Sequence, residues 1–250
     1  MILALAIATA SGDFGPIQAQ PTPNADAAQA ESEQGRQAFR DRAYGEAAEA
    51  FERALALRPD NPDDLLNLGR ARSALQQWDE AIAAYTRLIE LDPSNAKALH
   101  NLANAHLRRG DYEEAAVWYA KALEADPEYL LAAYNYGRAL KQLSRAEEAE
   151  QMFTRCLELQ PRSERDRRTQ LDCLFFSGTM RFGAGDYERS ASIMERVVSI
   201  YAKHAEAHYY LGMSYRRLGR GDEARQQLEI HKELLKQKRP KSTIEKQQDP

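Results

Sequence analysis

The side chains best suited to chemistry in this sequence of 250 residues are three asparagines that recur at a fixed interval. Asn67, Asn101 and Asn135 are each 34 residues apart. An asparagine amide both donates and accepts hydrogen bonds, so a row of amides can pair with the peptide groups of an extended chain, whatever its side chains. The spacing therefore predicts a ladder that binds a peptide backbone.

Basic side chains accompany this ladder. A second recurring place holds Arg36, Arg70 and Arg138, and Asn104 takes that place in the remaining unit. Acidic residues gather in the alternate segments, as at 113–114. We expect a basic groove on an acidic outer shell, which steers an acidic peptide or a C-terminal carboxylate inward. The alternative is ordinary solvated charge on amphipathic helices. The expected peptide-binding residues are Asn67, Asn101, Asn135, Arg36, Arg70, Asn104, Arg138, Lys97, Arg108 and Lys141.

Chemistry of other kinds has little support in the sequence. It contains no phosphate-binding glycine loop, no nucleophile elbow and no HExxH motif. His204 and His208 flank Glu206 at a spacing that a metal ion could use. However, His204 falls at a boundary between repeated units, where we expect a solvated loop. We therefore expect no catalytic residue, no metal site and no cofactor, and we interpret the protein as a non-enzyme.

The composition narrows the class of partner. Hydrophobic residues make up 43% of the chain and charged residues 29%, which is typical of soluble globular proteins. The net charge is −4, so the molecule as a whole is not built to attract nucleic acid. We expect a protein or peptide partner and no nucleic acid.

The rest of the chain follows the same interval as the asparagines. Columns of proline, alanine, aromatic residues and glycine all recur with one period of 34 residues. The columns are Pro59, Pro93, Pro127 and Pro161; Ala47, Ala81, Ala115 and Ala149; Phe51, Tyr85, Tyr119 and Phe153; and Gly35, Gly69 and Gly137, with Ala103 at the missing place. Within residues 95–127, two segments of helical periodicity are separated by Gly110 and Asp111, which predicts a helix, a turn and a second helix.

A helix–turn–helix unit of 34 residues with these small, aromatic and proline columns resembles the tetratricopeptide repeat. The resemblance implies an all-α, right-handed superhelix, a solenoid of about six such units, whose first helices line a concave surface. Asn67, Asn101 and Asn135 also resemble the asparagine ladder in the repeat domain of the O-linked N-acetylglucosamine transferases. Against that reading, asparagine is common at this place throughout the family, and three residues make a short ladder.

The resemblance also implies a role. We expect a non-catalytic protein–protein interaction module that binds an extended, acidic peptide segment in its concave groove. The alternative is a structural scaffold that acts through self-association or surface contacts, without a peptide ligand. The carboxylate clamp by which some family members bind chaperone tails is only partly matched. Asn67 and Lys97 agree with it, but Arg36 and Asn101 do not, so we do not expect chaperone-tail binding.

The repeats divide the chain into segments. We expect four units over 28–163 and two more over 171–238, separated by a highly charged insertion at 164–170 that lengthens a helix or a loop. A linker at 20–27 precedes the repeats, and a polar tail at 239–250 follows them.

The first residues point to export. Residues 1–10 are apolar but too short to span a bilayer, and small residues follow them, so 1–19 resembles a secretory signal peptide. We expect a periplasmic or secreted protein, with no membrane segment in its mature form. The alternative is a cytoplasmic protein with an unstructured apolar N-terminus.

Two cysteines are present, and their state stays open at this point. Cys156 occupies a small-residue column, and Cys173 begins the first helix of the next unit. These helices are neighbours, so a disulfide could form in an oxidising compartment. The charged insertion between the two cysteines blurs their relative geometry.

Overall fold

The computed structural model describes residues 23–238. Within that range the chain forms twelve α-helices and no β-strand. They are α1 (Pro23–Arg40), α2 (Tyr44–Leu57), α3 (Pro62–Ala74), α4 (Trp78–Leu91), α5 (Ala96–Arg109), α6 (Tyr112–Ala125), α7 (Leu130–Gln142), α8 (Ala146–Glu158), α9 (Glu164–Gly183), α10 (Tyr187–Ile200), α11 (Ala205–Arg217) and α12 (Gly221–Lys238).

Several predicted segments fall outside this range. The expected signal peptide (1–19) and polar tail (239–250) lie outside the described residues, and so do residues 20–22 of the expected linker. Residues 23–27 of that linker belong to α1. None of the described helices combines the length and the apolar character that crossing a bilayer requires.

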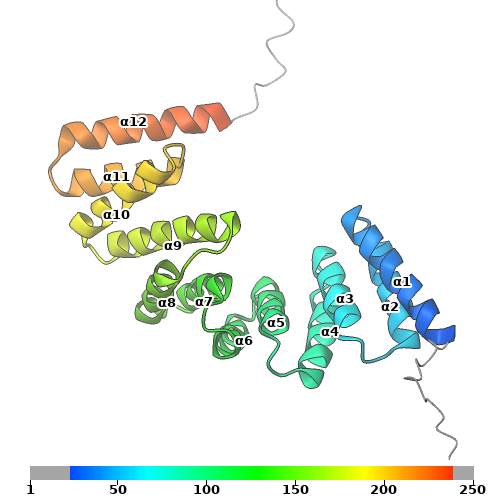
Figure 1. Ribbon diagram of the computed structural model, residues 1–250. Helices are drawn as coiled ribbons and strands as arrows, with labels where there is room; N and C mark the ends of the chain where they lie inside the picture. The colour runs from blue at the N-terminus through cyan, green and yellow to red at the C-terminus, as the bar shows by residue number, and fades with distance from the viewer. Residues whose placement is uncertain (1–22, 239–250) are drawn as a thin grey trace, which may run out of the picture.

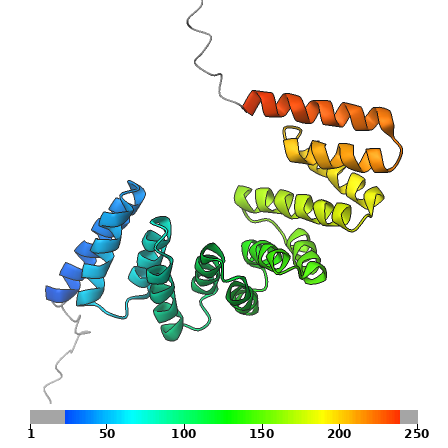
Figure 2. The ribbon, with the colours of Figure 1, turned by 180° about the vertical axis from the view of Figure 1, so that it is seen from behind.

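The helices stack in sequence order as antiparallel pairs. Each helix packs against the next along the whole chain, and the pairs form an open arc (Figure 1; Figure 2 from behind). In the middle of the arc, α5, α7 and α9 lie on the inner side, and α6 and α8 lie on the outer side. The prediction of an all-α repeat solenoid is confirmed.

The small and aromatic columns explain the close approach of the helices within each pair. A Cβ atom built on Gly35 would lie 2.8 Å from the ring of Phe51, and one on Gly137 would lie 2.8 Å from the ring of Phe153. Since real Cβ contacts are not that short, a larger residue at either place would force the two helices apart. The aromatic ring fills the space that the glycine leaves, and both Phe51 and Phe153 are completely buried.

Local signals fix where the helices begin and end. The side chain of Asn95 accepts a hydrogen bond from the amide of Ala98 at 3.0 Å, which caps the start of α5. At the other end, Gly110 has a φ of +101°, the left-handed conformation that glycine adopts without strain. Asp111 caps α6 through no side-chain hydrogen bond. Its carboxylate instead lies 3.2 Å from Nδ1 of His106, so it links the two helices of the unit.

The helix α9 departs from the regular pattern. It has 20 residues, whereas α5, α6 and α10 have 14 each, and its first two turns are residues 164–170. A disulfide between Cys156 and Cys173 ties α8 to α9, with both cysteines completely buried. The side-chain amide of Gln170 donates to the carbonyl of Leu159 at 2.7 Å, at the open end of α8. The charged insertion is therefore helical and firmly attached to its neighbour.

Candidate functional site

The inner surface of the arc carries a groove with a volume of about 780 Å³. Its lining comes mainly from α3, α5 and α7, with contributions from the start of α9 and from the edges of α1 and α4. Four arginines line it: Arg70, Arg108, Arg138 and Arg165. Among the described residues, no aspartate or glutamate lines the groove. The site therefore has a high density of positive charge in a chain whose net charge is −4.

The floor of the groove is a network of neutral polar side chains. The hydroxyl of Tyr119 donates to Oδ1 of Asn104 at 2.6 Å. The amide nitrogens of Asn104 and Asn135 lie 3.2 and 3.1 Å from Nε2 of His100. Amide nitrogens only donate, so Nε2 is the acceptor and the ring proton resides on Nδ1. Nδ1 faces the hydroxyl of Tyr129 at 3.3 Å.

Burial keeps this floor uncharged. Desolvation lowers the pKa of His100 to about 4, and the positive charge of Arg165 acts in the same direction. Burial also raises the pKa of Tyr119 above its ordinary value and that of Tyr85 to about 12. Around neutral pH these groups are a neutral imidazole and neutral phenols. The arginines therefore supply the charge of the groove, and the floor supplies dipoles.

Two of the arginines are held by the same arrangement in alternate repeats. The guanidinium of Arg70 donates to Oδ1 of Asn67 at 3.0 Å and lies 4.7 Å from the centre of the Phe39 ring. That of Arg138 lies 3.4 Å from Oδ1 of Asn135 and 5.5 Å from the ring centre of Tyr134. An amide oxygen and an aromatic face orient each cation without neutralising it.

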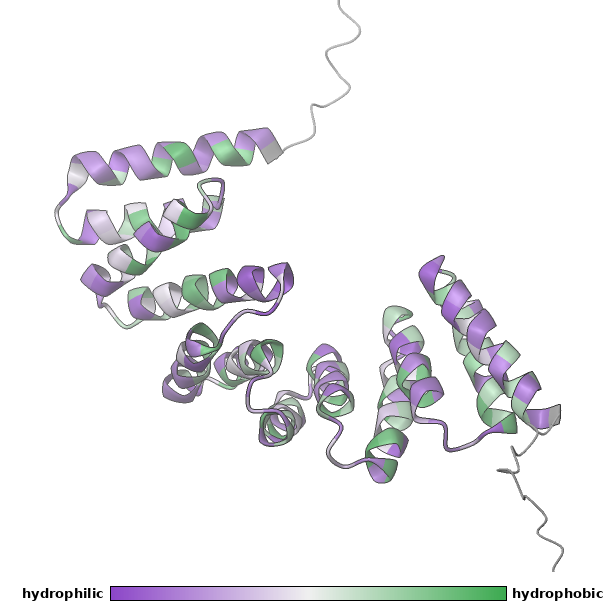
Figure 3. Ribbon diagram, in the orientation of Figure 1, coloured by the Kyte–Doolittle hydropathy of each residue, from purple (hydrophilic) through white to green (hydrophobic). Residues whose placement is uncertain are grey.

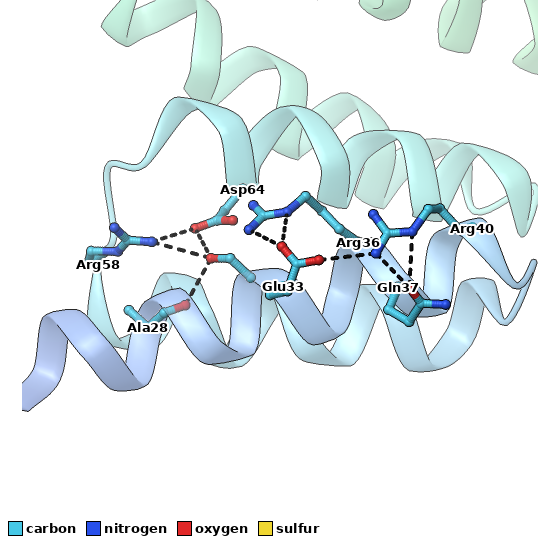
Figure 4. Close-up of polar contacts among 8 residues, drawn as sticks. Ala28, Glu33, Arg36, Gln37, Arg40, Arg58 and Asp64 are labelled. Carbon is cyan, nitrogen blue, oxygen red and sulfur yellow. Dashed lines mark hydrogen bonds and ion pairs between the residues drawn. The ribbon is translucent and has the colours of Figure 1, made fainter.

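These cations keep their charge available. Within residues 23–238, none of Arg70, Arg108, Arg138 and Arg165 forms an ion pair. Asp172 is the acid whose charge acts on Arg138, and burial nevertheless raises the pKa of its carboxyl. In the first repeat, by contrast, Glu33 binds both Arg36 and Arg40 (Figure 4), with Arg36 at 2.8 Å.

Six of the ten predicted peptide-binding residues meet in this groove. They are Arg70, Asn101, Asn104, Arg108, Asn135 and Arg138. The other four lie outside its lining. Arg36 is paired with Glu33, Asn67 holds Arg70, and Lys97 is exposed at the start of α5. The ammonium of Lys141 lies 4.9 Å from the ring centre of Phe176.

The asparagines have different surroundings from those expected of a free ladder. The side-chain oxygens of Asn67 and Asn135 accept from Arg70 and Arg138, and Asn135 is buried and also bound to His100. These two amides therefore position arginines in the free protein. Contact between a ligand and the three asparagines stays a prediction.

Arg165 is the groove residue that the sequence reasoning missed. The insertion was expected only to lengthen a helix or a loop, which gave none of its residues a place near α5. A signal was present, because Ser163 followed by Asp166 is a helix-start pattern. Its hydroxyl indeed accepts from the amide of Asp166 at 3.1 Å. A helix that starts at this point brings Arg165 into the groove.

The histidines considered as metal ligands make other contacts. The ring of His208 lies 2.6 Å from Oε1 of Gln227 and 2.9 Å from the carbonyl of Ala202. Nδ1 of His204 accepts from the amide of Ala207 and so caps α11. In the described part of the chain, no group of three or more His, Cys, Asp or Glu side chains is arranged to hold a metal ion.

Comparisons with known proteins agree with this architecture. Family models of the tetratricopeptide repeat match residues 66–129 and, in a second model, residues 106–166 and 181–239. No curated protein sequence matches the chain significantly.

Solved structures resemble the chain over most of its length. YrrB, described as a TPR protein with an unusual peptide-binding site, is 25% identical with a TM-score of 0.63, over 75% of this chain and 93% of its own. A tetratricopeptide repeat protein from Parabacteroides merdae is 23% identical with a TM-score of 0.67, over 86% and 81%. PilF of Pseudomonas aeruginosa is 16% identical with a TM-score of 0.67, over 87% and 100%. The family models cover more than half of the chain, which therefore belongs to the tetratricopeptide repeat family.

Proposed function

We propose that this protein is a non-catalytic interaction module that holds an extended, acidic segment of a partner protein in its inner groove. One observation carries the proposal. Four arginines line the groove, no acid lines it among the described residues, and none of the four is ion-paired there. Such a group of cations costs electrostatic repulsion in the free protein, and a ligand that brings carboxylates relieves it.

The contrast between groove and chain supports an acidic ligand. The chain carries a net charge of −4, while the lining of the groove is positive. An acidic partner is repelled by most of the surface and attracted to this region, which favours productive encounters. The neutral floor adds amide and hydroxyl groups that can bond the backbone of a bound segment, Asn101 and Asn104 among them.

The family supports a peptide as the ligand. Tetratricopeptide repeat proteins are in general interaction modules without catalysis. YrrB, whose structure resembles this one, has a peptide-binding site. An extended segment suits a long groove that crosses several helices, because its backbone can contact each helix in turn.

We also propose that the protein works in the periplasm or outside the cell. The apolar segment at residues 1–10 resembles the core of a signal peptide. The disulfide between Cys156 and Cys173 supports the same location, because disulfides persist in oxidising compartments and are rare in the cytosol. Its partner then belongs to the same compartment.

Binding of designed peptides to the purified chain tests the function. Fluorescence anisotropy compares glutamate-rich peptides with matched peptides in which glutamine replaces every glutamate. The double variant Arg108→Gln/Arg138→Gln removes two groove charges. Arg196→Gln is the control, since Arg196 is exposed on α10 and lines no groove. We expect the glutamate peptides to bind more tightly, with the preference reduced by the double variant and unchanged in the control.

Two results would contradict the proposal. Equal affinity for glutamate and glutamine peptides would exclude an acidic ligand. Tighter binding of a single-stranded oligonucleotide than of any peptide would identify a different polyanion. Light scattering on the same samples covers the scaffold alternative, which a stable oligomer without peptide binding would favour.

A further inference from the structure

The start of α9 forms an edge of the groove that a regular repeat would lack. The insertion adds two turns to this helix, and Arg165, in the first of them, lines the groove together with residues of α5 and α7. Figure 3 shows these first turns as a hydrophilic end of α9, in contrast to the apolar middle of the helix. The extension has too little apolar surface to be there for core packing.

Several interactions hold this end of α9 in place. Ser163 caps the helix, and the carboxylate of Asp166 accepts from the backbone amide of Arg162 at 2.9 Å. One turn later, the side chain of Gln170 donates to carbonyl groups at the end of α8. The disulfide from Cys173 to α8 follows. The backbone of Arg165 is therefore fixed relative to the groove, and a fixed charge selects among ligands better than a mobile one.

The other arginine of the extension that faces a carboxylate is already engaged. Arg167 forms an ion pair with Glu164 at 3.1 Å. Arg165 forms no ion pair with any described residue, although it is exposed. Its charge acts on His100 and Tyr129, lowering the pKa of each against the larger or parallel effect of burial. Arg165 therefore lies over the His100–Tyr129 edge of the floor.

Arg108 lies at a different edge of the same floor. His100 and Arg108 are eight residues apart in α5, which corresponds to about 12 Å along a helix axis. An extended chain covers that distance with about three to four residues. The two arginines are thus placed to contact two different acidic side chains of one bound segment.

We propose that Arg165 is a specificity-determining residue, which with Arg108 selects segments whose two acidic residues lie about three to four positions apart. This inference rests on the proposed function and deepens it, because it states which acidic segments the groove prefers. The insertion at residues 164–170 then has a role, namely to carry one arm of a two-point clamp. A groove without it would bind acidic segments with no preferred spacing.

A series of peptides tests this proposal on the full chain. Each peptide has one fixed glutamate and a second at a varied distance, in an otherwise neutral, polar sequence. The proteins are the wild type, Arg165→Gln and the control Arg168→Gln, since Arg168 is exposed on the same extension but does not line the groove. In the wild type and the control, we expect the second glutamate to increase affinity about fivefold at the preferred spacing.

Arg165→Gln should abolish this gain while it leaves the affinity for the peptide with one glutamate almost unchanged. A gain that survives in Arg165→Gln, or a gain that is the same at every spacing, would overturn the inference. Failure of the proposed function gives a different result, because the wild type would then not distinguish glutamate from glutamine peptides at any spacing. Arg165→Lys adds a check, and it should keep part of the gain because it keeps the charge but not the planar fork.

Discussion

The side-chain amide of Asn135 in α7 donates to Nε2 of His100 in α5 at 3.1 Å, and both residues are buried. This bond joins two neighbouring repeats beneath the arginines of the groove. It also explains why His100 is neutral, since a protonated ring could not accept it. The floor is thus a structural link and the surface on which we expect a ligand to lie.

This link predicts a dependence of stability on pH. Burial lowers the pKa of His100 from 6.5 to about 4. Between these values the unfolded chain binds a proton that the folded chain does not, so stability falls as the pH decreases from 6.5 towards 4. The full effect is about 3 kcal/mol. Urea denaturation at several pH values measures it, and His100→Gln should have a shallower slope. Equal slopes in the two proteins would refute the assignment to His100.

A second prediction concerns the buried carboxylate of Asp64, which is 1% exposed (Figure 4). It accepts from the hydroxyl of Ser32 at 2.9 Å and lies 3.6 Å from the guanidinium of Arg58. Arg58→Met leaves this carboxylate without its cation and should cost about 2 to 3 kcal/mol of unfolding free energy. Arg87→Met removes an exposed pair with Asp60 and should cost less than about 1 kcal/mol. Similar losses in both variants would contradict the importance of burial.

Two glycines give a matched test of helix packing. Gly137→Ala places a Cβ atom 2.8 Å from the ring of Phe153, and we expect a loss of about 1 to 3 kcal/mol. Gly45→Ala, in the first turn of α2, has open space around the new atom and should stabilise the protein by up to about 1 kcal/mol. Thermal unfolding followed by circular dichroism measures both. Loss of stability in both variants would mean that close approach is not the reason for Gly137.

The sequence was informative about the fold because each column of the repeat has a packing role of its own. Gly137 and Phe153 can be read directly, since one must be small where the other is large. The groove was harder to predict, because its geometry depends on contacts between repeats. Nothing in the sequence indicates that Asn67 holds Arg70 while Asn101 lies in the groove. Arg165 was missed because it enters from a helix whose phase the insertion had shifted.

The disulfide predicts a response to reductants. Cys156 and Cys173 are 17 residues apart, so opening the bridge should cost about 3 kcal/mol. We expect the melting temperature to fall on addition of dithiothreitol, whereas the double variant Cys156→Ser/Cys173→Ser should not respond to it. Titration of free thiols in protein secreted from its host completes the test, and two free thiols there would contradict the bridge and the proposed export.

The central claim is that the groove recognises negative charge through its unpaired arginines. The most direct measurement is the affinity of one glutamate peptide and its glutamine counterpart for the wild type, across a range of salt concentrations. We predict that the glutamate peptide binds more tightly at low salt, and that its advantage shrinks as salt screens the arginines. An affinity that is the same for both peptides, or that does not change with salt, would contradict the account.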